Sequence, residues 1–288
     1  TGHEDGSLAG ARRSRCRWAC YLKAMNPKVL ITELHDEECA AWLGERAEVM
    51  WVPHDDPEPL TAALPEADGL VVRTYTQVNE ALLKQAPKLK VIGRAGVGLD
   101  NFDLPACAAA GVKVVYTPDA NTQAVVEYVT GLMIDHVRPK TRLPGGADAD
   151  TFHAMRKTEV GTQLDEMTLG ILGFGRIGKR LGAVAHAIGM NMRVCDLLTE
   201  VELRKAVDYP FTFCRHEELY QGSDVVTVHV DGRPENRGMI GKAAFDAMRE
   251  HVLLINAARG MVVDHDALVE WAQARPGSTA LLDVHDPE

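Results

Sequence analysis

The sequence predicts an α/β protein made of two doubly wound domains, each built around a parallel sheet. Short runs of β-branched and aliphatic residues alternate with segments whose apolar residues recur at helical spacing. This alternation occurs twice, and a long apolar helix followed by a loop rich in proline and glycine separates the two series. Such alternation is typical of βαβ units, which form parallel sheets.

The composition is that of a globular protein and argues against several classes of partner. The 288 residues are 46% hydrophobic and 25% charged. A net charge of -10 disfavours binding to nucleic acid or to an anionic membrane surface, because both need a basic face. No apolar run approaches the ~20 residues that span a bilayer. We therefore expect neither a nucleic-acid partner nor a membrane partner.

The cysteines favour reduced thiols over disulfides or a zinc site. Their spacing contains no C-x-x-C pair and no Cys/His pattern typical of zinc, so no metal is expected. Several lie in or beside apolar segments, where a free thiol behaves as a small hydrophobic group. Reduced thiols are typical of the cytoplasm, which is the predicted location. The cysteines are Cys16, Cys20, Cys39, Cys107, Cys195 and Cys214.

The first domain is expected to cover residues 25–117. Residues 1–24 have no initiator Met, no clear periodicity and no apolar core of a secretory signal, so we interpret them as a non-native or disordered leader. Met25 then opens directly into a strand. Strands are expected at KVLIT (28–32), EVMWV (48–52), GLVVR (69–73), KVIGR (90–94) and VKVVY (112–116), with helices at DEECAAWLG (36–44) and NEALLKQAP (79–87).

The second domain is expected to cover residues 118–288. It begins with a long helix over 121–137, with Asn121 or Thr122 as the N-cap. This helix is apolar on more than one face, so we expect it to be buried between the two domains. Residues 138–150 then read as a loop. Strands are expected within MTLGILGFG (167–175), NMRVCDLL (191–198), SDVVTVHV (223–230), HVLLINAARG (251–260) and STALLDV (278–284).

A glycine motif directly follows the first strand of the second domain. Gly173, Gly175 and Gly178 form G-x-G-x-x-G at the start of a helix, with Arg176 and Ile177 inside the motif. The first glycine permits a tight turn, the second lets the backbone approach a pyrophosphate, and the third lets helix and strand pack closely. The phosphates would then lie at the helix N-terminus. The motif predicts a Rossmann dinucleotide-binding domain, whereas a merely structural glycine turn is the alternative.

Asp196 strengthens this prediction and favours NAD as the cofactor. It ends the next strand, close to the ~20-residue offset of the acid that binds the adenine ribose. A carboxylate at this place would repel the 2′-phosphate of NADP. The alternative is an ordinary aspartate at a strand end.

Four separated motifs remain, VIGRAGVGLDNFD (91–103), YTPDANTQAVVE (116–127), ELYQGSDVVTVHVDGRPENRGMIG (218–241) and LLINAARGMVVD (253–264). Together they resemble the D-isomer-specific 2-hydroxyacid dehydrogenases, and within them most closely the branch that acts on D-3-phosphoglycerate. The resemblance extends from Met25 to Glu288. It implies a substrate-binding first domain, an NAD-binding second domain, dimers formed through the NAD-binding domain and a place in serine biosynthesis.

The first two motifs, taken with Arg73, imply the substrate-binding residues. By resemblance, the backbone amides of Gly96, Val97 and Gly98 hold the substrate carboxylate, as a glycine-rich anion nest can do. Asn121 matches the helix between the domains. Arg73 matches an arginine that binds the anionic substrate in the phosphoglycerate branch, and a surface salt bridge is the alternative.

The last two motifs imply the residues around the nicotinamide. His229 and Val230 match the loop beside it, and in this loop Asp231 replaces the proline usual in the family. Arg259 matches the catalytic arginine, with Ala257 and Ala258 before it. A guanidinium at the carboxyl end of a parallel strand can bind a carboxylate bidentately and polarise the C2 oxygen.

Two further residues at the end of the chain are implied by the resemblance. Asp283 matches a residue near the nicotinamide, and burying it without a partner would be costly, which favours a cofactor contact. Glu288 stands at the family's spacing from Arg259 and matches the glutamate that orients the acid–base histidine. No Pro-His pair follows Arg259, so we interpret the chain as truncated and expect NAD binding with little or no turnover.

The function that follows is an NAD-dependent oxidoreductase acting on a small anionic D-2-hydroxy acid, with 3-phosphoglycerate favoured. Dehydrogenases acting on glyoxylate, hydroxypyruvate or lactate carry the same motifs. A non-catalytic NAD-binding interaction or sensor protein on the same fold is the alternative from another class.

Overall fold

A computed structural model describes residues 26–33, 36–138, 142–158 and 160–287. The chain divides into two compact units between Ala120 and Asn121. The predicted leader and Glu288 lie outside the described residues, as do Cys16 and Cys20.

The first unit contains a five-stranded, fully parallel sheet in the order β2-β1-β3-β4-β5. The chain steps from β1 to β2 on one side and then crosses to β3 on the other side. The switch point of the sheet therefore lies between β1 and β3. The strands are β1 (Lys28–Ile31), β2 (Glu48–Trp51), β3 (Gly69–Val72), β4 (Val91–Arg94) and β5 (Lys113–Tyr116).

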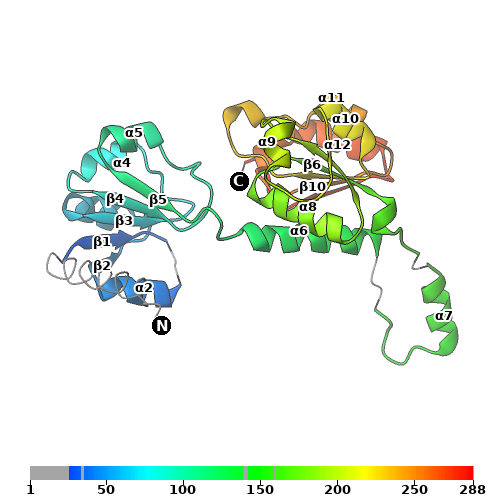
Figure 1. The fold of residues 1–288 in the computed structure, drawn as a ribbon. Coiled ribbons are helices and arrows are strands. Elements are labelled where there is room, and N and C mark those ends of the chain that lie inside the picture. Colours follow the sequence, from blue (N-terminus) through cyan, green and yellow to red (C-terminus); the bar gives the residue numbers. More distant parts are fainter. Residues whose placement is uncertain (1–25, 34–35, 139–141, 159, 288) are drawn as a thin grey trace, which may run out of the picture. The chain divides into compact units, whose positions relative to one another are not determined.

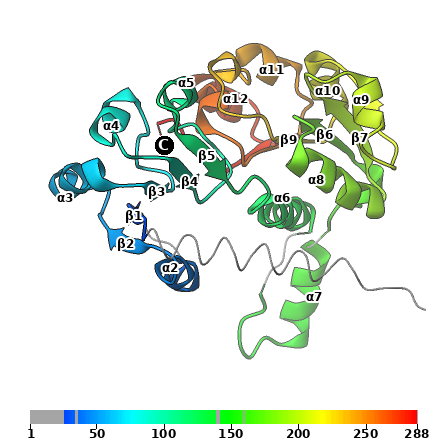
Figure 2. The ribbon, with the colours of Figure 1, turned by 60° about the vertical axis from the view of Figure 1, so that its left-hand side comes forward.

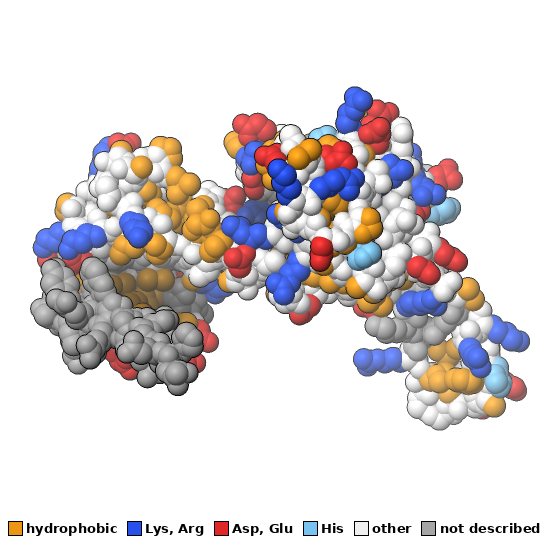
Figure 3. Space-filling model, in the orientation of Figure 1, with side chains coloured by type: hydrophobic (Ala, Val, Ile, Leu, Met, Phe, Trp, Pro, Cys, Tyr) orange, Lys and Arg blue, Asp and Glu red, His pale blue; other side chains and the backbone are white. Residues whose placement is uncertain are grey.

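One face of this sheet carries the core of the first unit. Leu30, Leu70 and Ile92 pack there against side chains of the crossover helices, such as Leu82 and Cys107. Hydrophobic side chains also lie on the surface of the unit (Figure 3), among them Trp51, Val91 and Val115. The helices are α2 (Glu37–Gly44), α3 (Pro57–Ala63), the 3-10 turn η1 (Leu64–Glu66), α4 (Glu80–Gln85) and α5 (Leu104–Ala109).

The second unit opens with the long helix α6 (Thr122–Val137). Asn121 is at the N-cap position as predicted, but its side chain makes no capping hydrogen bond. The expected burial of this helix between the two domains stays a prediction. The fully buried apolar residues Val126, Val129 and Met133 form a single stripe, because they are spaced by three and four positions.

The sheet of the second unit has six parallel strands in the order β11-β10-β9-β6-β7-β8. Counted from β6, this is the strand order of a Rossmann domain, with the switch point between β6 and β9. The predicted fold class is confirmed. The strands are β6 (Thr168–Leu172), β7 (Asn191–Cys195), β8 (Thr212–Phe213), β9 (Val225–Val228), β10 (Leu253–Asn256) and β11 (Thr279–Leu282).

Helices cover both faces of this sheet. Leu169 and Ile171 face a core that α6 and α8 (Arg176–Ala187) complete, and these two helices lie side by side in Figure 1 and Figure 2. Leu172 and Val226 face the other core. That core is closed by α10 (His216–Gly222), α11 (Lys242–Ala247) and α12 (His265–Ala274).

Several short elements were not predicted. They are α3, α5, α7 (Ala149–Thr158), α9 (Glu200–Arg204), β8 and the 3-10 turns η1, η2 (Leu164–Glu166), η3 (Pro234–Asn236) and η4 (Gly260–Val262). Helix α5 follows an N-cap aspartate, Asp103, which accepts the Ala106 N–H, and it has a proline in its first turn. Short helices of this kind lack enough apolar residues to show a helical period.

Candidate functional site

The glycine motif forms a tight turn at the carboxyl end of β6. Gly173 has φ 91°, a conformation that favours glycine, and its N–H donates to the Cys195 carbonyl at 2.9 Å. A Cβ at Gly173 would stand 2.7 Å from the backbone of His229. A Cβ at Gly178 would stand 2.4 Å from the Gly173 carbonyl oxygen. The first and third glycines are therefore needed for the turn and for close packing of α8, as predicted.

The second glycine stands at the open side of this turn. Gly175 is the exposed N-cap of α8, and a Cβ there would have no neighbour within 4 Å. The first amides of α8, from Arg176 and Ile177 onward, point toward this side, as they do at any helix start. A helix N-terminus with space beside it fits the pyrophosphate of a dinucleotide.

Asp196 connects the glycine turn to the loop after β7. Its carboxylate accepts the Phe174 N–H at 2.5 Å through Oδ2 and the Leu198 N–H at 2.9 Å through Oδ1. The side chain is half-buried. Each carboxylate oxygen has a second lone pair, so Asp196 can still accept hydrogen bonds from a ribose diol.

His229 lies on the other side of the switch point and is neutral. Its backbone N–H donates to the Leu172 carbonyl at 2.8 Å, and the ring Nε2 lies 3.0 Å from Thr227 Oγ1. Burial lowers the pKa of His229 to about 4. Its Nδ1 is closed off from solvent and finds no partner in the described ranges. An imidazole that stays neutral near pH 7 can line a nicotinamide site but does not act as a proton donor at that pH.

We predict that His229 makes the stability of the protein depend on pH. Its pKa is lower in the fold than the ordinary 6.5, so its contribution is complete above pH 6.5 and is lost as pH falls through about 4. The loss is about 3 kcal/mol of unfolding free energy. Urea unfolding at pH 7.5 and pH 4.5 measures it. His229→Gln should flatten this dependence, and His153→Gln, on exposed α7, should not; equal slopes for the two variants would contradict the assignment.

The loop after β9 is tied by a polar cluster at Asp231. Its carboxylate accepts two hydrogen bonds from Arg233, at 2.7 and 2.6 Å, and one at 3.0 Å from the buried Asn236. The pairing with Arg233 lowers the pKa of Asp231, so the carboxylate is charged. The residue that departs from the family's proline therefore holds this loop through hydrogen bonds.

Arg259 follows β10 in a turn that Asn256 organises. Asn256 is completely buried; its Oδ1 accepts the Ala258 N–H at 3.1 Å, and its Nδ2 donates to the Arg259 carbonyl at 3.0 Å. The half-buried Arg259 donates through Nη1 to the Ala258 carbonyl at 2.7 Å. A Cβ on Gly260 would overlap the His285 carbonyl. The last described residues thus pack directly against the arginine turn.

The first unit has its own candidate anion site at the carboxyl ends of β3 and β4. Gly96 has φ 159°, and a Cβ there would overlap the guanidinium of Arg94. Val97 and Gly98 continue this half-buried loop. Arg73 is exposed and follows the neighbouring strand β3, and its backbone N–H donates to the Glu33 carboxylate. Two arginines and a glycine-rich loop therefore share one edge of the sheet.

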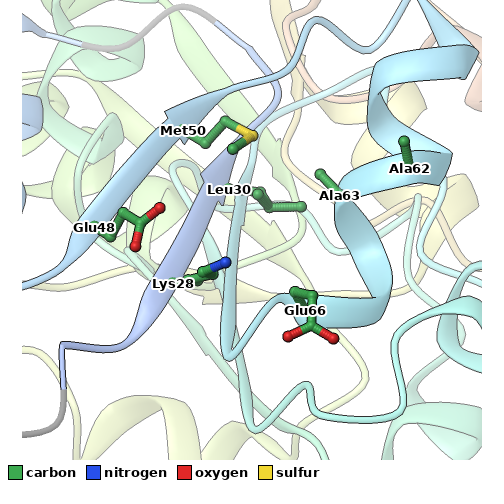
Figure 4. Close-up of a pocket in the computed structure, with 7 residues that line it drawn as sticks. All are labelled: Lys28, Leu30, Glu48, Met50, Ala62, Ala63 and Glu66. Carbon is green, nitrogen blue, oxygen red and sulfur yellow. The ribbon is translucent and has the colours of Figure 1, made fainter.

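A small cavity lies elsewhere in the first unit. Figure 4 shows it near the amino-terminal ends of β1 and β2. Arg73 and Gly96 follow the carboxyl ends of β3 and β4, at the opposite edge of the same parallel sheet. Its volume of 160 Å³ would hold a few water molecules. The lining residues are Lys28, Leu30, Glu48, Met50, Ala62, Ala63 and Glu66.

The described residues hold neither a candidate metal centre nor a candidate membrane span. Nowhere in the described part of the chain do three His, Cys, Asp or Glu side chains gather as metal ligands would. None of the helices described is at once long and apolar enough to traverse a bilayer.

The comparison with protein families decides the membership of the chain. Residues 130–288 match the profile described as "D-isomer specific 2-hydroxyacid dehydrogenase, NAD binding domain". The chain belongs to this family of D-isomer specific 2-hydroxyacid dehydrogenases. The cofactor of the matched domain is NAD, as the glycine motif and Asp196 predicted.

Individual relatives agree with the family assignment. The D-3-phosphoglycerate dehydrogenase of Mycobacterium leprae is 35% identical over 91% of this chain and 49% of the relative. The chain therefore spans about half the length of the curated relatives it matches. The TT0316 protein of Thermus thermophilus has a TM-score of 0.76 at 28% identity, covering 91% of this chain and 83% of that one. D-lactate dehydrogenase of Aquifex aeolicus, complexed with NAD and lactic acid, has a TM-score of 0.73 at 27% identity, covering 90% and 77%.

Within this chain the predicted residues fall into two groups. Within the second unit, the glycine turn, Asp196, His229–Val230 and Ala257–Arg259 follow neighbouring strands at one sheet edge. Arg73 and Gly96–Gly98 belong to the first unit, whereas Asn121 is the exposed first residue of the second.

The burial argument for Asp283 is wrong. Its side chain is exposed, since it follows β11, the outermost of the strands that the structure describes, and its backbone N–H donates to the Asn256 carbonyl at 3.0 Å. Its cofactor contact stays a prediction without that support. Glu288 falls outside the described residues.

Three residues of the two sites were missed from the sequence. Arg94 ends β4 beside Gly96, Asn256 ends β10, and Glu33 follows β1. The available signal was the same in each case, a polar residue closing an apolar strand.

We predict that Asp196 sets the preference for NADH over NADPH. Asp196→Ala removes the acceptor for the ribose hydroxyls and the charge that repels a 2′-phosphate. NADH affinity should fall about 10–100-fold, and the ratio of NADH to NADPH affinity should move toward one. Titrations of both cofactors measure the ratio. Asp208→Ala, an exposed aspartate of the same unit, is the control; an unchanged ratio in Asp196→Ala would refute the assignment.

Proposed function

We propose that the protein is an NAD-dependent oxidoreductase that transfers a hydride between C2 of a D-2-hydroxy acid and the nicotinamide. One observation carries this proposal. The glycine turn, Asp196, neutral His229 and Arg259 all lie at the carboxyl edge of one Rossmann sheet, around its switch point. Open α/β sheets bind ligands at that place.

The residues of the second unit have distinct proposed roles. The amides from Gly175 to Gly178 bind the pyrophosphate, and Asp196 accepts hydrogen bonds from the adenine ribose. His229, Val230, Ala257, Ala258 and Asp283 surround the nicotinamide, which when bound supplies the hydride acceptor. Arg259 binds the substrate carboxylate and stabilises charge on the C2 oxygen. Glu288 is proposed to orient an acid–base histidine.

The first unit supports a substrate with two anionic groups. Arg73 and Arg94 stand at the carboxyl ends of adjacent strands, and the loop Gly96–Gly98 follows directly after Arg94, with the Gly96 N–H donated to the Arg94 carbonyl at 2.9 Å. A carboxylate on the loop and a phosphate on the arginines fit this pairing. Relatives named D-3-phosphoglycerate dehydrogenase favour 3-phosphoglycerate, and with it a role in serine biosynthesis. Asn121 is proposed to contribute a further substrate contact.

Calorimetric titration of the NAD-saturated protein tests this choice of substrate. We expect 3-phosphoglycerate to bind about tenfold or more tightly than D-glycerate or D-lactate, since only it engages both arginines. Arg73→Ala should remove most of the difference. Arg46→Ala, an arginine of the same unit that stacks on Trp42, should retain it. Equal affinity of the wild-type protein for all three acids would favour a lactate- or glyoxylate-type substrate instead.

A homodimer in the cytoplasm is part of the same proposal. Helix α7 carries the exposed hydrophobic side chain Phe152, and Leu143 and Val160 are exposed before and after the helix. A second copy of the chain could cover these three side chains. The free cysteines, of which Cys107, Cys195 and Cys214 are buried, favour a reducing compartment. Light scattering of the purified protein measures the oligomeric state, and a monomer at micromolar concentration would contradict the dimer.

A further inference from the structure

Glu33 carries an unusual concentration of hydrogen bonds at the end of β1. The residue is only 6% exposed. Its carboxylate accepts the backbone N–H groups of four consecutive residues: Arg73 at 3.0 Å, Thr74 at 2.7 Å, Tyr75 at 3.1 Å and Thr76 at 3.1 Å. The Thr76 hydroxyl adds a fifth bond at 3.0 Å. The loop after β3 therefore forms an anion nest whose anion is a side chain of the protein itself.

The position of this nest in the fold gives it a functional meaning. Strands β1 and β3 are neighbours at the switch point of the first sheet, where folds of this topology bind their ligands. Glu33 occupies the amides that an external anion would otherwise use. A substrate anion is thereby directed to the side chain of Arg73 and to the next loop, Gly96–Gly98.

A second anchor joins these two loops. Asn101, which follows the Gly96–Gly98 loop, donates through Nδ2 to the Thr76 carbonyl at 2.7 Å and to the Arg73 carbonyl at 3.3 Å. The buried hydroxyl of Thr32 lies 2.7 Å from that of Thr76. The 73–76 loop is thus held through its amides by Glu33 and through its carbonyls by Asn101.

The charge of Glu33 is stable over the working pH range. Burial alone would raise its pKa, but the four backbone hydrogen bonds outweigh burial and lower the pKa to about 2. The carboxylate is therefore ionised at every pH at which a dehydrogenase would operate.

We propose that Glu33 is a positioning residue of the substrate site: it fixes the Arg73–Thr76 loop, and through Asn101 the Gly96–Gly98 loop, for binding of an anionic substrate. This inference rests on the proposed function for the identity of the substrate. It does not depend on that function for the fixation of the loop, which the hydrogen bonds define.

Glu33→Gln in the full chain tests the proposal, because it keeps the size of the side chain but removes its charge and puts an amide donor among amide donors. Hydrogen exchange reports the fixation of the 73–76 amides, and calorimetry reports binding of 3-phosphoglycerate and of inorganic phosphate. We expect at least tenfold faster exchange at residues 73–76 and about tenfold weaker binding of both anions, with NADH affinity unchanged. Glu33→Asp, which keeps the charge, should retain part of the binding.

Glu66→Gln is the matched control, since Glu66 is an exposed glutamate of the same unit that pairs with Lys88. Unchanged exchange in Glu33→Gln would overturn the proposal. Faster exchange with wild-type anion affinity would also overturn it, because Glu33 would then serve only the fold. If the wild-type protein binds inorganic phosphate but not 3-phosphoglycerate, only the proposed substrate is contradicted. The phosphate titrations of the variants would still decide the role of Glu33.

Discussion

Gly178→Ala should destabilise the second unit. Gly175→Ala should leave its stability unchanged but weaken cofactor binding. At Gly178 the new Cβ would stand 2.4 Å from the Gly173 carbonyl oxygen, a backbone atom that cannot move cheaply. We expect a loss of about 1–3 kcal/mol in unfolding free energy. At Gly175 the new Cβ has no neighbour within 4 Å, so stability should change by less than about 0.5 kcal/mol.

The same two variants separate folding from cofactor binding. The methyl group of Gly175→Ala would stand on the side from which a pyrophosphate reaches the amides of α8, so NADH affinity should fall about tenfold or more. Thermal unfolding and NADH titration of both variants measure the two effects. A Gly175→Ala variant that binds NADH as the wild type does would mean that the pyrophosphate does not approach the motif here.

Arg259→Ala should weaken binding of the 2-keto acid about 10–100-fold in the presence of NADH. A bidentate guanidinium–carboxylate contact contributes about 1.5–3 kcal/mol, which corresponds to that range. Arg259→Lys keeps the charge but not the paired donors, so we expect an intermediate loss. NADH affinity should change far less than affinity for the keto acid, because the glycine turn and Asp196 remain.

The control for Arg259 lies at the opposite edge of the same sheet. Arg249 pairs with Asp224, the residue before β9, and Arg249→Ala should leave keto-acid affinity unchanged. Calorimetric titration of the NADH-saturated variants compares them directly. If Arg259→Ala and Arg249→Ala bind the keto acid equally well, Arg259 is not the carboxylate ligand.

The parts of the fold that could be predicted from the sequence are those that local pattern determines. Buried parallel strands are continuous apolar runs, so β6 and β9 stand out in the sequence. Gly178 is required by its contact with Gly173 inside the motif, and Gly175 leaves an opening there, whereas Gly173 also meets the backbone of the distant His229. The two-residue strand β8 leaves no such pattern, since neither of its side chains is fully buried.

The missed and mistaken residues share a different cause. Glu33 obtains its partners from a loop forty positions away, and no local pattern reveals that a buried carboxylate will meet four amides. The apolar residues before Asp283 predict a buried side chain, yet β11 is the outermost strand described and Asp283 is exposed. Which strand lies at an edge is a property of the whole sheet, so local sequence could not show it.

The most direct test of the central claim is a titration of the wild-type chain with NADH and with NADPH, in which nicotinamide fluorescence measures binding. The geometry of the glycine turn and Asp196 predicts saturable binding of NADH, with NADPH about tenfold weaker or worse. Absence of NADH binding, or tighter binding of NADPH, would contradict the account of this site.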